Sequence, residues 1–268
     1  LNAIAHNLRE YQKILKSSTK VMAMVKAFAY GSGGAEIAGI LQYHKVDYLG
    51  VAYADEGIEL RKAGVTLPIM VMNPEDAAFE SIVEYNLEPN LYSFTLLHSF
   101  ESFLQKEGLQ RYRVHIEVET GMNRLGFAIS DIKKLADHLG STTLLKVQTV
   151  FSHLAASEDP AQDEFTLQQF NLYKHAVEQL KDKLNYSFLR HITNSAGIFR
   201  LPYLQLDMVR LGIGMYGVDS AMTHQSLLVP AATLKSTIAQ LKHLKAGESV
   251  GYNRRGVVKQ DAVIATVR

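Results

Sequence analysis

The sequence predicts an α/β protein: a (β/α)8 TIM barrel followed by the start of a β-rich C-terminal domain. Apolar, β-branched runs alternate with segments of helical spacing, a pattern typical of parallel βαβ units. The alternation extends over about 220 residues, a usual length for such a barrel. A doubly wound open sheet is the main alternative, because the runs alone do not show whether the sheet closes.

The expected elements follow one another along the first part of the chain. Ser130 is the expected N-cap of one helix, and Gly64 and Gly140 stand where helix C-caps are expected. Apolar residues at steps of three and four mark helix faces, namely Ile4, Leu8, Tyr11 and Leu15, then Ile132, Leu135, Ala136 and Leu139, then Phe170, Tyr173, Val177, Leu180 and Leu184. The predicted strands cover residues 20–26, 46–52, 68–72, 88–92, 112–118, 145–151, 188–193 and 206–210.

The pattern changes near residue 222. Helical periodicity stops, and residues 231–239 and 257–267 have the composition of strands, with Gly247 and Gly251 between them. We therefore expect a cofactor-binding barrel over 1–221 and an incomplete β domain over 222–268. The chain starts without Met and ends inside an apolar run, so we expect it to be a fragment of a longer protein.

Composition excludes several classes of function. Lys and Arg number 28 against 27 Asp and Glu, a net charge of +1, so no strong field attracts nucleic acid or an anionic membrane. The absence of Cys excludes disulfides, thiolate metal sites and Cys nucleophiles, and it suits a reducing compartment such as the cytoplasm. No apolar run is long enough to span a bilayer, and no metal site is expected.

Polar residues that could carry chemistry stand where the predicted strands end, and barrels hold their active sites there. Lys26 ends the first strand, where partial desolvation would lower its pKa and favour a Schiff base with a carbonyl cofactor. The alternative is a surface lysine that begins a loop. Arg124 follows the fifth strand, and its planar fork suits a carboxylate or a phenolate. Gly212 and Gly214 follow the eighth strand and allow the backbone to approach a phosphate closely.

Taken together, these segments resemble the signature motifs of the alanine racemase family, in the same order along the chain. The matching segments are Lys26-Ala27-Phe28-Ala29-Tyr30-Gly31, Thr120-Gly121-Met122-Asn123-Arg124-Leu125-Gly126, Ser152-His153, Asn194-Ser195 and Arg210-Leu211-Gly212-Ile213-Gly214-Met215-Tyr216-Gly217. The resemblance implies pyridoxal 5′-phosphate bound in the barrel. Lys26 resembles the lysine that forms the internal aldimine and serves as one of two bases. Cofactor contacts are implied for Lys26, Tyr30, His153, Asn194, Ser195, Arg210, Gly212, Ile213 and Tyr216.

The resemblance also implies how the ring is held. Arg210 is similar to the arginine that faces the pyridine nitrogen, with His191 behind it, and His153 resembles the imidazole that lies against the ring. Because arginine keeps its protons, the nitrogen should stay unprotonated, which disfavours a long-lived quinonoid and transamination. Arg124 resembles the arginine near the cofactor phenolate and the substrate carboxylate.

Two departures from the family pattern matter. Glu117 stands seven residues before Arg124, where many members carry a carbamylated lysine, so we expect its carboxylate to serve Arg124 directly. The second base of the family is a tyrosine of the C-terminal domain, delivered by the partner subunit. Tyr252 has the context of an earlier segment of that domain, and we do not assign it this role.

The resemblance implies an alanine racemase that acts as a homodimer in the cytoplasm and supplies D-alanine for peptidoglycan. The present chain would then lack one base and be inactive in racemisation. A non-catalytic barrel that holds pyridoxal phosphate is the first alternative, but residues 222–268 continue into β structure. A broad-specificity or serine racemase stays open. A decarboxylase on a related barrel is disfavoured, because Arg210 would keep the pyridine nitrogen unprotonated.

Overall fold

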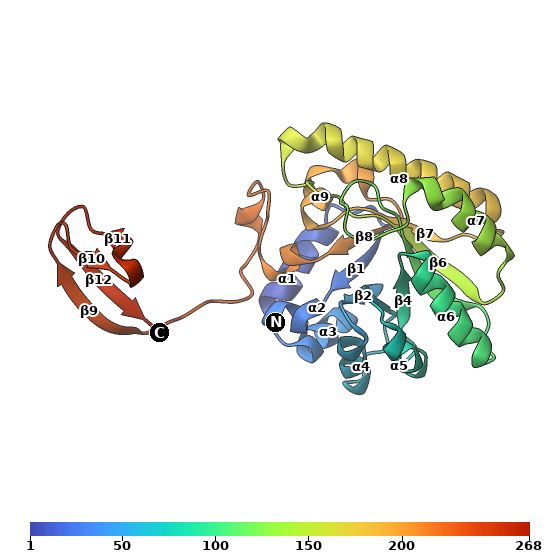
Figure 1. Ribbon diagram of the computed structural model, residues 1–268, viewed down its shortest axis with the longest axis horizontal. Coiled ribbons are helices and arrows are strands. Elements are labelled where there is room, and N and C mark those ends of the chain that lie inside the picture. Colours follow the sequence, from blue (N-terminus) through green and yellow to red (C-terminus); the bar gives the residue numbers. More distant parts are fainter. The chain divides into compact units, whose positions relative to one another are not determined.

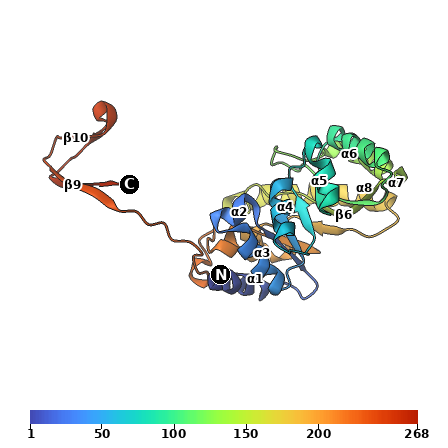
Figure 2. The same cartoon turned by 90° about the horizontal axis from the view of Figure 1, so that it is seen from below.

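The computed structural model describes residues 1–268 as two compact units, Leu1–Ala231 and Ala232–Arg268. The first unit holds one sheet of eight parallel strands in the order β7-β6-β5-β4-β3-β2-β1-β8, with helices on its outer side (Figures 1 and 2). The predicted (β/α)8 barrel is thus confirmed, and the open doubly wound sheet is excluded. The strands are β1 Lys20–Met24, β2 Tyr48–Val51, β3 Ile69–Val71, β4 Glu88–Leu91, β5 Tyr112–Glu117, β6 Leu145–Phe151, β7 Leu189–His191 and β8 Met208–Leu211.

The helices bury the faces that their spacing predicts. Tyr173, Val177 and Leu180 of the longest helix are buried, as are Ile4, Leu8 and Tyr11 of the first. Burying such a stripe against the strands is what holds an amphipathic helix in place. The helices are α1 Asn2–Gln12, α2 Lys26–Gly31, α3 Gly34–Tyr43, α4 Ala54–Lys62, α5 Phe79–Glu84, α6 Phe94–Lys106, α7 Ile132–Ser141, α8 Asp163–Lys183 and α9 Ser195–Arg200.

Two of the predicted helix caps are wrong. Ser130 lies inside a 3-10 turn, Ile129–Asp131, and Asp131 is the residue that precedes α7. Gly140 lies within α7, where an added Cβ would stand 3.0 Å from the carbonyl oxygen of Lys183, so it permits a close approach to the end of α8. Gly64 follows α4 with φ +87°, the left-handed conformation in which many helices end.

The barrel closes between β7 and β8. The Arg210 N–H donates to the Thr193 carbonyl (3.0 Å), and the Asp207 N–H donates to the Arg190 carbonyl (3.2 Å). The Arg190 guanidinium also donates two hydrogen bonds to the Asp207 carboxylate, at 2.7 and 2.9 Å. This two-pronged ion pair fixes the distance between the starts of the two strands.

Side chains inside the barrel divide into two kinds. An apolar cluster is centred on β1 to β3 and includes several methionines, and a separate core lies between the strands and the helices. The other inward-facing positions, on β4 to β8, are polar and buried. The apolar cluster is Met22, Met24, Tyr48, Met70, Phe151 and Met208, and the polar set is Glu88, Asn90, His115, Glu117, Thr149, His191 and Arg210.

The second unit is made of antiparallel strands. β9 (Ile238–Leu244) pairs with β12 (Ala262–Val267), and β10 (Ser249–Val250) pairs with β11 (Gly256–Val257). The strand expected over 231–239 is wrong, because β9 begins at Ile238 and residues 232–237 lie outside any strand. Nowhere in the chain is there a helix with the length and apolar character needed to cross a membrane.

The closing ion pair gives a first prediction. Asp207→Asn should lower the free energy of unfolding by about 1–3 kcal/mol, because the carboxylate receives the Arg190 guanidinium and the Arg190 backbone N–H. Urea-induced unfolding followed by circular dichroism measures the change. Asp137→Asn is the matched control, since its ion pair with Lys183 is half exposed and should contribute much less to stability. Equal losses in the two variants would contradict the role of Asp207.

Candidate active site

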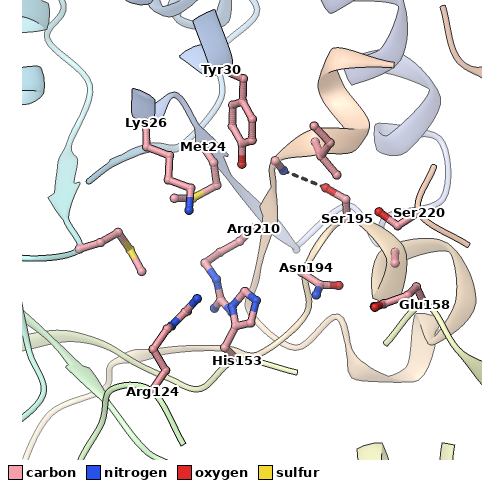
Figure 3. Close-up of a pocket in the computed structure, with 14 residues that line it drawn as sticks. Met24, Lys26, Tyr30, Arg124, His153, Glu158, Asn194, Ser195, Arg210 and Ser220 are labelled. Carbon is pink, nitrogen blue, oxygen red and sulfur yellow. Dashed lines mark hydrogen bonds between the residues drawn. The ribbon is translucent and has the colours of Figure 1, made fainter. Parts of the chain in front are cut away.

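A cavity of about 230 Å³ lies where the barrel strands end, and Figure 3 shows the side chains that surround it. Its walls come from segments that follow six of the eight strands, so residues far apart in sequence meet in it. This is the end of the barrel at which active sites are found. The lining residues are Met24, Lys26, Tyr30, Met72, Arg124, His153, Glu158, Asn194, Ser195, Ala196, Arg210, Gly212, Ile213 and Ser220.

Lys26 enters the cavity from an unusual backbone turn. Residues Ala27–Tyr30 within α2 all have φ between +52° and +54°, so four successive residues other than glycine form a left-handed turn. Each such residue costs about 1–2 kcal/mol relative to the right-handed form. The Glu56 carboxylate helps to hold the turn by accepting the N–H groups of Ala27 (2.5 Å) and Ala52 (2.6 Å). Both Lys26 and Tyr30 consequently point into the cavity (Figure 3).

The opposite wall offers hydrogen-bond donors to an anion. The Ser195 hydroxyl oxygen accepts the N–H groups of Gly212 (2.9 Å) and Gly214 (3.2 Å), which leaves the hydroxyl hydrogen to donate elsewhere. The Ile213 N–H between them donates to no protein acceptor. A Cβ at Gly212 would stand 2.9 Å from the Tyr30 hydroxyl, so only glycine at this position leaves room for that hydroxyl on this wall.

Arg210 lies at the floor of the cavity with 3% of its surface exposed. It donates to His191 Nδ1 (2.6 Å), to the Ser152 and Ile192 carbonyls (2.7 and 3.2 Å) and to His153 Nδ1 (3.2 Å). Burial lowers the pKa of Arg210 to about 10, so the group is still a cation at neutral pH. All four bonds leave from Nη1 and Nη2, and the Nε–H has no protein acceptor.

His153 is neutral in this setting. Burial, followed by the positive charges of Arg210, Arg124 and Lys26, lowers the pKa of His153 to about 3. Because its Nδ1 accepts from Arg210, the ring carries its hydrogen on Nε2. His153 thus presents an uncharged, flat ring to the cavity.

Glu117 is placed differently from the sequence-based expectation. Its Oε2 accepts a hydrogen bond from Asn90 Nδ2 at 2.6 Å, and no hydrogen bond or ion pair joins it to Arg124. Arg124 lies on an exposed turn, and its side chain lines the cavity. Its backbone N–H donates to the Glu119 carboxylate (3.4 Å). Burial raises the pKa of Glu117, while Asn90, Arg210 and Arg124 oppose this shift. Glu117 therefore acts on the two arginines through its charge at a distance.

Comparisons with known proteins identify the family. The profile described as "Alanine racemase, N-terminal domain" matches residues 1–220, and "Alanine racemase, C-terminal domain" matches residues 231–268. The chain belongs to the alanine racemase family.

Individual alanine racemases match along the whole chain. "Alanine racemase 1" of Caldanaerobacter subterraneus subsp. tengcongensis is 33% identical over 100% of this chain and 69% of its own length. The solved alanine racemase of Clostridium difficile 630 superposes with a TM-score of 0.83 at 32% identity, covering 100% of this chain and 70% of its own. That of Bartonella henselae, described "with covalently bound pyridoxal phosphate", gives 0.82 at 27% identity over 99% and 72% of the two chains.

Most residues that the alanine racemase resemblance singled out meet at the cavity. Lys26, Tyr30, Arg124, His153, Asn194, Ser195, Arg210, Gly212 and Ile213 all line it. Tyr216 does not, because its hydroxyl donates to the Met24 carbonyl (3.1 Å) and its ring packs 4.5 Å behind that of Tyr30. His191 is buried beside Arg210, and Glu117 is buried beside Asn90. Neither residue lines the cavity.

Several residues that hold the cavity walls in place or complete its lining were not identified from the sequence. Ser157 donates to Asn194 Oδ1 (2.6 Å), which also accepts the Gly197 N–H and so caps α9. Met24, Met72, Glu158, Ala196 and Ser220 complete the lining. Alternation would have placed Met24 inside the barrel, but no local signal separates Ser157 or Ser220 from other loop serines.

Buried neutral histidines predict a pH dependence of stability. The pKa of His153 is about 3 in the folded chain against 6.5 for a free histidine, so the unfolded chain binds more protons between these values. Stability is then fully present above pH 6.5 and falls by about 1.4 kcal/mol per pH unit as pH drops below it. Urea unfolding at pH 7.5, 6.0 and 5.0 measures this slope.

His153→Gln should flatten that slope by about 1.4 kcal/mol per pH unit, because glutamine does not titrate. The exposed His175 on α8 is the control position, and His175→Gln should leave the slope near that of the parent chain. A slope that is the same in both variants would mean that His153 is not held neutral by the fold.

Proposed function

We propose that this protein uses pyridoxal 5′-phosphate to interconvert L- and D-alanine. The single observation that carries the proposal is the presence, in one cavity, of a strand-end lysine and of an anion cradle made by Ser195 and the Ile213 N–H. A lysine and a separate phosphate cradle are what this cofactor needs. Family membership supports the same chemistry.

The donor set fits each part of the cofactor. The Ser195 hydroxyl, the Ile213 N–H and the Tyr30 hydroxyl would hold the phosphate, with Asn194 and Gly212 beside them. Lys26 would bind the carbonyl carbon, and the neutral His153 ring would lie against the cofactor ring. The unused Nε–H of Arg210 would donate to the ring nitrogen, because arginine has no acceptor to offer.

The reaction then depends on a few side chains of the cavity. Pyridoxal phosphate, when bound, withdraws electrons from the α-carbon of an amino acid and makes its Cα–H acidic. The Lys26 amine takes or returns the proton on one face of that carbon. Arg124 binds the substrate carboxylate with its planar fork. The small cavity between Tyr30, Met24 and Met72 favours an amino acid with a short side chain such as alanine.

Racemisation requires a base on each face of the α-carbon, and Lys26 serves only one. We propose that the opposite base is a tyrosine from a partner subunit, so that the active form is a homodimer. Tyr252 is fully exposed within its own unit and is not assigned this role. We place the protein in the cytoplasm, as a source of D-alanine for peptidoglycan.

The lysine assignment predicts the outcome of chemical trapping. Pyridoxal phosphate added to the chain and reduced with borohydride should leave a pyridoxyl group on Lys26, detected by peptide mass spectrometry. The same chain should exchange the Cα–H of alanine in heavy water, and Lys26→Ala should lower that exchange by at least about 10²-fold. Labelling of another lysine, for example Lys146, would contradict the assignment.

The charge of Glu117 gives a further prediction. Glu117→Gln keeps the shape but removes a charge that offsets Arg210 and Arg124, so Cα–H exchange should slow by about tenfold. The parent protein should be insensitive to removal of carbon dioxide, because the carboxylate is part of the side chain. Glu84→Gln, an exposed change on α5, is the control and should exchange at the parent rate. Unchanged exchange in Glu117→Gln would exclude the role of Glu117.

A further inference from the structure

A continuous chain of hydrogen bonds crosses the barrel interior beneath the cavity. Arg210 Nη1 lies 2.6 Å from His191 Nδ1, and His191 Nε2 lies 2.9 Å from the Thr149 hydroxyl. The same hydroxyl lies 2.8 Å from His115 Nδ1, and His115 Nε2 lies 3.0 Å from Glu88 Oε2. All five residues have at most 3% of their surface exposed, so water does not compete for these bonds.

The chemistry of the two ends fixes the direction of three of the four bonds. Arginine only donates, so His191 Nδ1 must accept, and the hydrogen of the neutral ring is on Nε2. The Thr149 oxygen accepts that hydrogen, and its own hydroxyl hydrogen is free to bind His115 Nδ1. At the far end His115 Nε2–H donates to the Glu88 carboxylate, because an ionised carboxylate only accepts. The two ends therefore set the directions of the His191 and Glu88 bonds.

The electrostatics of the two ends agree with this arrangement. Burial, Arg210 and His115 hold the pKa of His191 well below its usual value, so the ring stays neutral. Burial alone would raise the pKa of Glu88, but the interactions with His115 and Arg113 outweigh it, and the net shift is downward. The chain therefore runs from a buried cation to a buried anion through the neutral His191 ring, the Thr149 hydroxyl and His115, and groups linked in this way polarise one another.

An irregularity in the sheet places the middle of this chain. In the β5–β6 ladder Val114 pairs with Val147, but His115 pairs with Thr149, so Gln148 is an extra residue of β6. Without this shift His115 would stand opposite Gln148. Bulges of this kind re-aim side chains near functional sites. Here the shift brings the Thr149 hydroxyl between two histidines from the strands on either side of it.

We propose that Glu88, His115 and Thr149 are positioning residues that act through His191 on Arg210. They hold His191 as an acceptor, which fixes the guanidinium so that its Nε–H, which donates to no protein atom, stays available to a ligand in the cavity. If Thr149 could not accept from Nε2, the ring could place its hydrogen on Nδ1 and would repel Arg210. The consequence for cofactor and substrate rests on the proposed function, whereas the tautomers do not.

The first experiment measures the tautomers without any cofactor. Long-range ¹H–¹⁵N NMR of the 268-residue protein labelled with ¹⁵N-histidine distinguishes Nε2–H, Nδ1–H and doubly protonated rings. Signals are assigned from His191→Gln and His115→Gln. We expect the His191 ring to carry a single hydrogen on Nε2 from pH 8 to pH 6, and the His115 ring to carry a hydrogen on Nε2. A hydrogen on Nδ1 of His191, or a His115 ring without a hydrogen on Nε2, would overturn the proposal whether or not the protein binds pyridoxal phosphate.

The second experiment removes one hydroxyl. Thr149→Val should abolish the single His191 tautomer and lower the kcat of Cα–H exchange about tenfold with little change in KM, and Thr149→Ser should restore both. Thr166→Val is the matched control, because the Thr166 hydroxyl is buried without any partner. If the parent protein exchanges the Cα–H and Thr149→Val exchanges it at the same rate as the parent and Thr166→Val, the positioning role is excluded. If the parent protein neither binds the cofactor nor exchanges the Cα–H, the proposed function fails. The tautomer measurement still tests the positioning role of the hydrogen-bond chain in that case.

Discussion

The buried positive charge of Arg210 is the constraint around which the barrel interior is organised. A cation with 3% exposure is stable there because the groups bonded to it are acceptors and a carboxylate lies within range of its charge. Two backbone carbonyls, two imidazole nitrogens and the more distant Glu117 carboxylate meet that demand. These groups come from the ends of β5, β6 and β7, so satisfying one guanidinium draws together the strand ends that also form the cavity.

The same constraint explains why the interior is divided. Polar side chains occupy inward positions of β4 to β8, on the side of the Arg210 charge. Methionine and aromatic side chains fill the side nearest β1 to β3. Methionine is adaptable enough to pack around an irregular polar cluster. Gly50 on β2 completes this fit, because a Cβ there would stand 2.6 Å from the terminal methyl of Met24. The cavity therefore has one apolar side and one side rich in donors.

Local pattern in the sequence was enough for the scaffold and for most of the cavity. The strands lie within a few residues of their expected positions, because buried parallel strands are continuous apolar runs. Lys26, Ser195 and Arg210 were recognisable because they follow such runs. Tyr216 lies behind Tyr30 and off the wall, a detail that the motif did not show, because a motif gives adjacency in sequence and not which of two neighbouring tyrosines reaches the cavity. Thr149 could not be identified from the sequence, because its position between two histidines depends on a one-residue shift between β5 and β6.

The left-handed turn at Ala27–Tyr30 has a consequence for how this molecule assembles. A free chain of these residues prefers the opposite hand, so nothing local can nucleate the turn. It becomes stable only once Glu56 of α4 is in place to receive the N–H of Ala27 and the eighth strand has brought Gly212 beside Tyr30. The shape of the turn that follows Lys26 therefore depends on contacts with α4 and with the segment after β8, and a change at Glu56 or Gly212 would be felt at the cavity without touching the lysine.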